Sequence, residues 1–320
     1  LSALENKIID ENFKVNCTGK IEMYGQTYHC WKKKGHGIVN LKSAMKQSCD
    51  TYFYEIARKL GVDRLKETSI KFGLGEKVLN ETFSIEKKGL IPDTKWKKNN
   101  LGKGWVIGET LITGIGQGYT QTTPLQLCQM TAQLANGGFK IYPKIIVDKD
   151  SKTSEEIRLI MNENRKQLNK QDGRLKDTTE ELLEFLNKKE HETLFKSSRN
   201  INLVREAMFA STNEIRGTSY KSRIDNPKYQ FAGKTGTSQV RRITEAAREL
   251  DLSTSEIPYD ERDHALYIAF GPYKNPRYAL SIVIEHGGSG SSAAAPIAKK
   301  LFKLIIDRHE LREKQNNLEI

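Results

Sequence analysis

The last third of the sequence constrains the fold most strongly, because three segments with strand character follow one another there. Residues 229–240, 264–272 and 278–287 are rich in aromatic and β-branched side chains, which favour strands. A Lys274-Asn275-Pro276 turn separates the last two, and residues 295–311 have the spacing of an amphipathic helix. Because helical patterns precede the strands, this order predicts an α+β fold with a central antiparallel sheet flanked by helices.

Helical patterns dominate the first half of the chain. Residues 38–61 have helical apolar spacing after Asn40, a good N-cap residue, although the polar residues of QSCDT favour a break within this stretch. Residues 123–137 predict a second helix, with Thr123 as N-cap and Pro124 in the first turn. Between them, residues 72–118 are rich in Gly, Lys and Asn and are expected to be mostly loop, and residues 140–148 are strand-like.

Residues 149–200 differ from the rest of the chain in charge. They contain 12 basic and 11 acidic residues among 52, a density typical of a solvated surface and not of a core. We therefore expect one domain over residues 1–320, interrupted by a charged helical insertion at about 149–200.

Composition narrows the class of protein. The chain has 320 residues, with 52 Lys and Arg against 40 Asp and Glu, which gives a net charge of +12. These basic residues are dispersed and form no aromatic-interleaved patch, which argues against a nucleic-acid partner. No apolar run reaches the ~20 residues needed to span a bilayer, and neither an initiator Met nor a signal peptide is present. We expect a fragment of a longer protein, attached to a membrane only through an N-terminal anchor outside this sequence.

Two short motifs carry the chemistry. S-C-D occupies residues 48–50 and K-T-G occupies residues 234–236. In serine acyl-transferases the set is S-x-x-K, S-x-N or S-x-D, and K-T-G, because a serine nucleophile needs a lysine base and a second polar pair to relay a proton to the leaving amine. The run GGSGSSAAAP at 287–296 lacks the Lys-Ser/Thr of a phosphate loop and is interpreted as a flexible connection.

The segments around these motifs resemble a known family. GHGIVNLKSAMKQSCDTYFYEIARKLG, GIGQGYTQTTPLQLCQMTAQLANGG, EIRGTS, FAGKTGTSQV, DHALYIAFGPY and HGGSGSSAAAPIA closely resemble the transpeptidase domain of class B, elongation-type penicillin-binding proteins (the penicillin-binding protein 2 family). The resemblance covers nearly the whole chain except the charged insertion. It implies the serine-transpeptidase (β-lactamase-like) fold.

The resemblance also implies roles for individual residues. Ser48 corresponds to the serine that relays a proton to the leaving group, and Asp50 holds the third position of that motif. Lys234 corresponds to the motif lysine near Ser48 and the substrate carboxylate. Thr235 and Thr237 would offer hydroxyls to that carboxylate, and the N–H of Thr237 would stabilise the oxyanion.

Two further points of the comparison concern Gly236 and the S-x-x-K motif. Gly236 is expected to keep the strand edge clear for a bound peptide. No S-x-x-K lies where the family order requires it, and the chain is expected to begin immediately after that motif. The 320 residues alone are therefore expected not to form an acyl-enzyme.

Three cysteines and a histidine are candidates for a metal site. Cys17, Cys30, His36 and Cys49 provide the ligand types of a structural zinc site, although the spacing is not that of a standard finger. A Cys17–Cys30 disulfide is the alternative in an extracytoplasmic protein. Some elongation-type relatives carry zinc beside the second motif, with a His and a Cys in positions resembling His36 and Cys49, which favours zinc. Cys128 is expected to be a buried core thiol.

The resemblance predicts a D,D-transpeptidase that cross-links peptidoglycan stem peptides during cell elongation. Implied partners are the stem peptide, β-lactam antibiotics and a RodA-type glycosyltransferase. The full-length protein would be anchored in the inner membrane, facing the periplasm, and would help determine cell shape. Two alternatives remain open: a catalytically inactive remnant or scaffold of the family, and a D,D-carboxypeptidase or β-lactamase.

Overall fold

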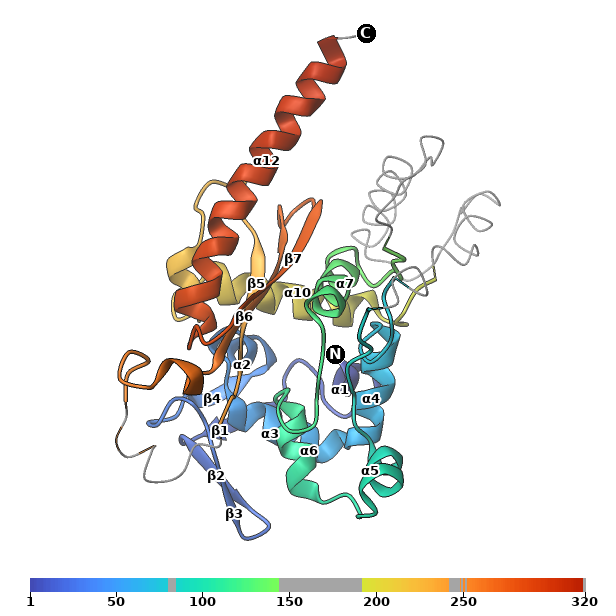
Figure 1. Cartoon of the computed structure of the whole chain (residues 1–320), viewed down its shortest axis with the longest axis vertical. Helices are drawn as coiled ribbons and strands as arrows, with labels where there is room; N and C mark the ends of the chain where they lie inside the picture. The colour runs from blue at the N-terminus through green and yellow to red at the C-terminus, as the bar shows by residue number, and fades with distance from the viewer. Residues whose placement is uncertain (80–84, 144–191, 242–247, 249, 251, 319–320) are drawn as a thin grey trace.

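The structure of the chain is a computed structural model that describes residues 1–79, 85–143, 192–241, 248, 250 and 252–318 (Figure 1). Its strands are β1 (Lys14–Cys17), β2 (Lys20–Met23), β3 (Gln26–His29), β4 (Gly37–Asn40), β5 (Ala232–Ser238), β6 (His264–Gly271) and β7 (Tyr278–Ile284). Its α-helices are α1 (Ser2–Glu5), α2 (Leu41–Gln47), α3 (Asp50–Leu60), α4 (Val62–Lys71), α5 (Thr94–Leu101), α6 (Ile107–Gly114), α7 (Pro124–Ala135), α10 (Ser198–Asn213) and α12 (Ala295–Leu318). Short turns of other helix types are η3 (Tyr220–Ser222), η4 (Tyr259–Glu261) and the π-helical η5 (Gly290–Ala294).

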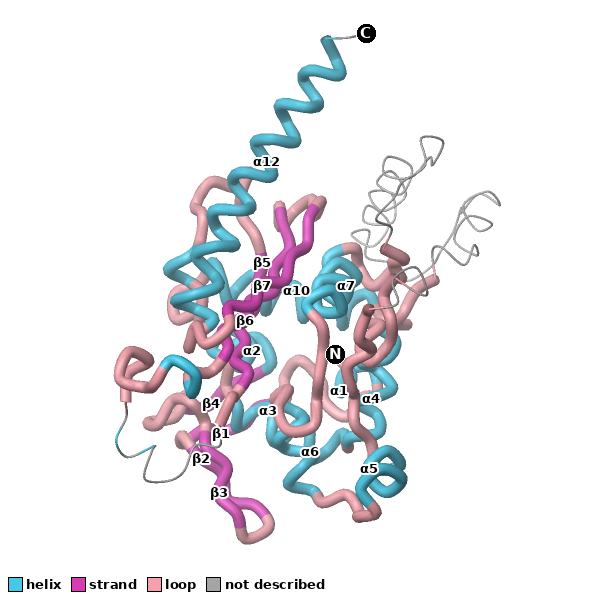
Figure 2. The backbone as a smooth tube through the Cα atoms, in the orientation of Figure 1, coloured by secondary structure: helices cyan, strands magenta, loops and turns pink. Residues whose placement is uncertain are grey.

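The three strands predicted in the last third form one antiparallel sheet in the order β5-β6-β7. In the register of this sheet, Lys234 lies opposite Ile268 and Thr237 lies opposite Ala265. Only β6 pairs with β5 among the described strands, so the K-T-G segment lies on a sheet edge (Figure 2).

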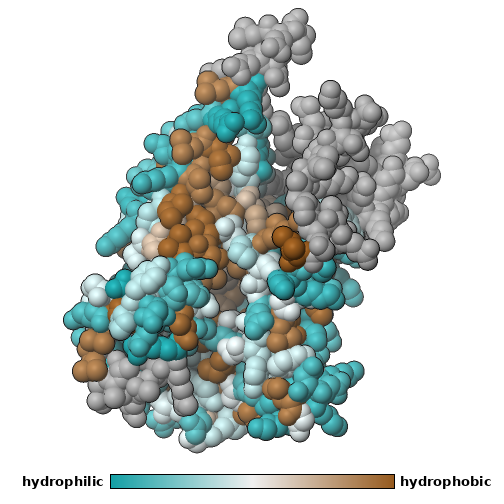
Figure 3. Space-filling view, in the orientation of Figure 1, coloured by the Kyte–Doolittle hydropathy of each residue, from teal (hydrophilic) through white to brown (hydrophobic). Residues whose placement is uncertain are grey.

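Helices cover both faces of this sheet (Figure 1). Side chains alternate along β6, so that Phe270 joins a core with α7 and α10, whereas Tyr267 and Ala269 join a core with α12. This arrangement confirms the predicted α+β class. Figure 3 shows a broad hydrophobic area on the part of the molecule that contains α12 and the sheet. Val283 of β7 and Leu304 of α12 are exposed apolar residues.

A third core lies in the N-terminal part of the chain. It joins α1, α2 and α3 with β1 and β4, which pair antiparallel, while β2 and β3 form a separate hairpin. Asn40 caps α2 in a capping box with Ser43, as the sequence indicates. The predicted break also occurs: α2 ends at Gln47, its C-cap Ser48 has left-handed backbone angles (φ 53°, ψ 52°), and α3 begins at Asp50.

The helix expected at 123–137 is confirmed as α7, with Thr123 as N-cap, and the C-terminal helix is confirmed as α12. The expectation of loop over residues 72–118 is wrong in part, because α5 and α6 lie within it. Asp93 caps α5 by accepting from the Trp96 amide, and Glu109 bonds back to the Val106 amide at the start of α6. These local caps compensate for the weak apolar periodicity of the two helices. The helix α4 was not predicted.

Two further expectations concern the charged segment. Residues 140–143 form no strand, and residues 144–148 of that prediction lie outside the described residues. Most of the predicted insertion, residues 149–191, also lies outside them. Its last part belongs to the domain: Phe139 bridges to Thr193, and α10 begins at Ser198. Across the described residues, no helix is long and apolar enough to cross a membrane.

Candidate active site and metal centre

The fold brings Ser48 and Lys234 together, although 186 positions separate them in the chain. Ser48 lies at the junction of α2 and α3, and Lys234 lies on the edge strand β5. The Lys234 Nζ donates to Ser48 Oγ at 2.5 Å and to the carbonyl oxygen of Thr235 at 2.8 Å. The left-handed conformation of Ser48 sharply reverses the chain between the two helices, which explains why they form a corner and not one continuous helix.

The Lys234 side chain is partly buried, and desolvation of its ammonium lowers its pKa to about 8, although the charge of Asp50 opposes the shift. An amine with a pKa near 8 exists in both protonation states close to neutral pH. Lys234 can therefore both donate a proton to Ser48 and accept one from it, which is the property that a proton relay needs.

Hydroxyl groups continue from this pair into the interior. Ser48 Oγ lies 3.5 Å from Thr235 Oγ1, which donates to Thr218 Oγ1 at 3.0 Å, and Thr218 Oγ1 lies 3.1 Å from Ser211 Oγ. The amide of Thr218 donates to the carbonyl oxygen of Lys46, at the end of α2. The chain of hydroxyls thus connects β5, α10 and the end of α2, and fixes the position of Ser48 relative to the strand.

The outer edge of β5 is bridged by one side chain. Gln117 Nε2 donates to the carbonyl oxygen of Thr237 at 2.6 Å, and Gln117 Oε1 accepts from the amide of Gln239 at 3.4 Å. The side-chain amide of Gln117 thus bonds to the outward-facing C=O of Thr237 and the N–H of Gln239, as the backbone of a neighbouring strand would. The backbone groups of Thr237 therefore face away from β6, toward the side where a peptide could bind.

Gly236 has a packing role in addition to its place on the edge. A Cβ on Gly236 would lie 3.3 Å from the Cβ of Leu266, a tight contact within the sheet. Gly290 of η5 approaches the same point, since a Cβ there would lie 2.7 Å from the carbonyl oxygen of Gly236. Glycine at position 290 allows η5 to lie directly against the K-T-G segment.

Asp50 is close to Lys234 in electrostatic terms but is bonded elsewhere. Its Oδ2 accepts from the backbone amide of Trp31 at 2.8 Å. Burial raises the pKa of Asp50 to about 7. The charge of Cys30 adds to this increase, and the charge of Lys234 opposes it. The geometry makes Asp50 a link between α3 and the segment after Cys30, so its effect on Lys234 is through space.

The spacing S-x-x-K does occur at Ser43–Lys46, within α2. There the Ser43 hydroxyl bonds to Asn40 in the capping box, and Lys46 Nζ bonds to Glu214 Oε2 at 3.0 Å. Both side chains are thus engaged in holding the helix. The same spacing at 84–87 starts at a residue outside those described.

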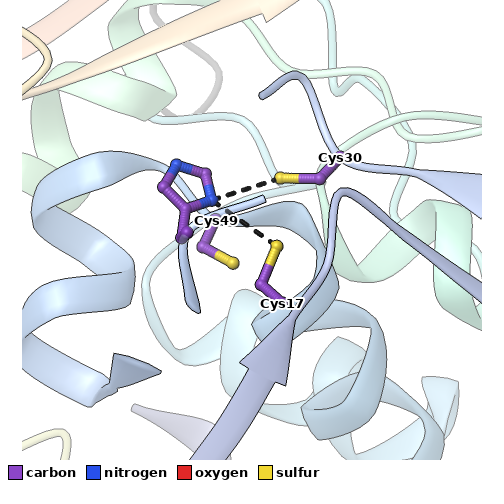
Figure 4. A group of neighbouring side chains, drawn as sticks. Cys17, Cys30 and Cys49 are labelled. Atoms are coloured by element: carbon purple, nitrogen blue, oxygen red, sulfur yellow. Dashed lines mark hydrogen bonds between the residues drawn. The ribbon is translucent and has the colours of Figure 1, made fainter. Parts of the chain in front are cut away.

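The four predicted metal ligands converge on one point (Figure 4). Cys17 ends β1, Cys30 follows β3, His36 precedes β4 and Cys49 precedes α3. Their ligand atoms all lie within 4.8 Å of one another. The three cysteine side chains are buried, and every cysteine of the chain is a free thiol, so the alternative of a Cys17–Cys30 disulfide does not occur in this structure.

The distances in this cluster fit a tetrahedral ion. Cys17 Sγ and Cys30 Sγ lie 3.6 and 3.5 Å from His36 Nδ1. Zinc bonds of ordinary length to sulfur and nitrogen place such atoms about 3.6 Å apart across a tetrahedral edge. A hydrogen bond from the Cys49 thiol lowers the pKa of Cys30 and raises that of Cys49. The cluster thus favours a thiolate, the form that binds zinc.

Sequence reasoning missed three participants in this site: Thr218, Ser211 and Gln117. Thr218 lies within EIRGTS and Gln117 within GIGQG, segments that match the family as a whole but carry no recognised catalytic spacing. No local pattern distinguishes a hydroxyl that meets β5 from one that faces solvent. Their roles depend on the register of β5 and the packing of α10, which only the structure gives.

Comparison with known proteins identifies the family. The family model for the "Penicillin binding protein transpeptidase domain" matches residues 1–303. The chain is 34% identical over 284 residues to peptidoglycan D,D-transpeptidase MrdA of Salmonella typhimurium, covering 88% of this chain and 40% of that protein. It is 29% identical over 320 residues to MrdA of Escherichia coli K12, covering 99% of this chain and 45% of the relative. The chain therefore spans less than half the length of these relatives.

Solved structures give the same result. Pseudomonas aeruginosa PBP2, in complex with WCK 5153, matches with a TM-score of 0.69 and 32% identity, over 95% of this chain and 57% of that one. Helicobacter pylori PBP2, in complex with MreC, matches with a TM-score of 0.71 and 30% identity, over 95% and 47%. The edge strand, the two motifs and these matches agree, and the chain belongs to the family of penicillin-binding protein transpeptidase domains.

Proposed function

We propose that this chain is the cross-linking domain of an elongation-type peptidoglycan D,D-transpeptidase. The observation that carries the proposal is the 2.5 Å contact between Lys234 Nζ and Ser48 Oγ, at the edge of the K-T-G strand. It joins the second and third motifs of the serine acyl-transferase set in one place. The substrate would be the D-alanyl end of a stem peptide, and β-lactams would bind at the same edge.

In this proposal, Ser48 and Lys234 move a proton. Cleavage of the peptide bond releases an amine that must gain a proton, which the Ser48 hydroxyl gives while it takes one from the Lys234 ammonium. The lowered pKa of Lys234, about 8, matches its proton affinity to this exchange near neutral pH. The family's nucleophile motif has no suitably placed counterpart in these 320 residues, so no residue of this chain is assigned that role.

The edge of β5 would hold the peptide. A substrate strand that pairs with β5 needs the carbonyl oxygen of Thr237, which Gln117 now engages. Gln117 would therefore yield this position to the substrate backbone. The Thr237 N–H, on the same edge, is the proposed oxyanion donor, and the hydroxyls of Thr235 and Thr237 would meet the carboxylate.

The same proposal includes a structural zinc ion held by Cys17, Cys30, His36 and Cys49. When bound, the ion would cross-link residues 17–36 to the start of α3 without taking part in the reaction. Since Cys49 is adjacent to Ser48, this cross-link would fix the serine that faces Lys234. Three thiolates and one imidazole form a ligand set that strongly favours zinc over hard cations.

We further propose that the full-length protein lies in the inner membrane, faces the periplasm and pairs with a RodA-type glycosyltransferase in determining cell shape. The Helicobacter pylori relative, solved in complex with MreC, makes an MreC-like protein a second candidate partner. Co-purification with each protein separately tests these two pairings.

The function is tested by a chimaera in which these 320 residues replace the matched segment of Salmonella typhimurium MrdA. We expect fluorescent penicillin to label the chimaera and the chimaera to cross-link stem peptides. Lys234→Ala should slow acylation by about 100-fold or more, whereas Lys95→Ala, an exposed lysine on α5, should not. A chimaera that melts cooperatively yet is not labelled contradicts the proposal.

The alternatives predict other outcomes. Release of the terminal D-alanine without transfer would indicate a D,D-carboxypeptidase, and turnover of penicillin would indicate a β-lactamase. The 320-residue chain by itself should not be labelled. Labelling of that chain would place a nucleophile within it, and Ser48→Ala would then show whether Ser48 is the residue acylated.

A further inference from the structure

A cavity of about 470 Å³ lies between η3, η5 and the first turns of α12. Four of the eight residues that line it are lysines: Lys221, Lys299, Lys300 and Lys303. The other four are three serines and a proline, so no acidic residue lines the cavity. The volume is in the range of sites for small ligands, and the lining carries a formal charge of +4.

These lysines have few internal counter-charges. In the regions that the structure describes, none of the four makes an ion pair with a carboxylate. The ammonium of Lys303 lies over the ring of Tyr229, 5.9 Å from its centroid. The nearby acids of α12, Asp307 and Glu310, form ion pairs with Lys228, although the charge of Lys303 also acts on Asp307. The positive charges of Lys221, Lys299 and Lys300 are therefore the ones available to a ligand.

The position of the lysines on α12 points the same way. Lys299, Lys300 and Lys303 lie in the first three turns of the helix, and its first turn contains no acidic residue. Lys299 and Lys300 lie four and three positions before Lys303, so their like charges are neighbours on the helix surface and repel one another. This repulsion favours an anion between them.

The chemistry of the lining selects among anions. Arginine, whose planar fork matches carboxylates, is absent from the residues that line the cavity, and the donors that these residues can offer to an anion are lysine ammonium groups and serine hydroxyls. The hydroxyl of Ser292 already donates to the carbonyl oxygen of Ser289, so the lysines are the main donors. Compact ammonium charges and hydroxyls suit the tetrahedral oxygens of a phosphate group. Ser222 is almost fully buried, with 3% of its surface exposed, and is one of the residues that line the cavity.

We propose that this cavity is a binding site for a phosphate-bearing ligand, distinct from the Ser48–Lys234 site. The phosphate would lie between η3 and the start of α12, held by Lys299, Lys300 and Lys221. It would come either from a soluble phosphate compound or from the headgroup of an anionic phospholipid. Both present the same group to the same lysines.

The test measures binding of inorganic pyrophosphate to the 320-residue chain by isothermal titration calorimetry. The variant is Lys299→Gln/Lys300→Gln. The control is Lys95→Gln/Lys98→Gln, which removes two charges from exposed lysines of α5. We expect the first pair to weaken binding by about tenfold or more, and the control pair by much less, because long-range attraction is screened by salt. Circular dichroism establishes that both variants are folded.

Co-sedimentation with vesicles of phosphatidylglycerol in phosphatidylcholine identifies the source of the phosphate. Vesicle binding that pyrophosphate displaces and Lys299→Gln/Lys300→Gln weakens indicates a lipid headgroup. Pyrophosphate binding with no vesicle binding indicates a soluble ligand. The proposal is overturned if pyrophosphate does not bind, if both variants lose affinity equally, or if only vesicles bind.

Discussion

The two halves of the site are held in place by different physical means. The half on β5 is fixed by the sheet register, with Lys234 opposite Ile268, and by apolar cores on both faces of the sheet. The half around residues 14–49 consists of the strand pair β1–β4, the hairpin β2–β3 and a helix corner, where Cys17, Cys30 and Cys49 are buried next to His36. The first half is an ordinary packed sheet, and the second contains four candidate ligands that the proposed zinc ion would cross-link. The comparison teaches that the contact between Ser48 and Lys234 depends on two regions that are stabilised in different ways.

The largest effect should follow loss of a metal ligand. We expect Cys49→Ser to lower the free energy of unfolding by more than about 3 kcal/mol, because the binding energy of a structural zinc ion is part of the folding energy. Cys128→Ser is the matched control, since this half-buried thiol lies outside the cluster and donates to the carbonyl oxygen of Ala279. Thermal melts with and without a chelator measure both. A chelator that leaves the wild-type melt unchanged would exclude a stabilising ion.

The second prediction concerns pH and the β5 half. The pKa of Lys234 is about 8 in the folded chain and 10.5 as an ordinary lysine. Below pH 8, Lys234 is protonated in both the folded and the unfolded chain, and burial of its charge opposes folding. Between pH 8 and 10.5 the unfolded chain binds more protons than the folded chain, so the free energy of unfolding rises with pH. We expect wild type to gain about 1–2 kcal/mol relative to Lys234→Met across this window. Denaturant titrations at pH 7 and 10 measure it, and parallel curves would show that Lys234 is not buried.

A smaller effect is expected at the helix corner. Ser48 has φ of 53°, a conformation that costs a residue with a Cβ about 1 kcal/mol but costs glycine little. Ser48→Gly should therefore be about 1 kcal/mol more stable than Ser48→Ala, although both lose the hydroxyl. Urea denaturation of the two variants compares them directly. Equal stabilities would mean that the corner relaxes out of the left-handed region.

The smallest effect is expected for Gln117→Ala. This change removes two partly exposed hydrogen bonds on the edge of β5, so the Gln239 amide should exchange with solvent a few times faster, equivalent to about 0.5–1 kcal/mol. The amide of Ile268 on the central strand β6 is the internal control. If the Gln239 amide exchanges at an unchanged rate, Gln117 does not occupy the substrate edge in solution.

The sequence predicts the β5 half better than the rest of the site. K-T-G lies in a segment with strand composition, and the three strands and α12 follow from local patterns. The Cys/His cluster was predicted as a set of residues because its ligand types are specific, even though its spacing is not. In contrast, α5 and α6 were missed because their caps outweigh weak periodicity. Thr218 and Gln117 could not be foreseen, since their contacts join segments far apart in the chain.

The most direct measurement of the central claim is the pKa of Lys234 itself. The claim is that β5 and the α2–α3 corner meet so closely that Lys234 loses water and contacts Ser48. Lysine labelled with ¹⁵N at Nζ, assigned by comparison with Lys234→Met, can be titrated by NMR. The account predicts a pKa of about 8. A pKa near the ordinary 10.5 would show that the two halves do not meet, and would contradict it.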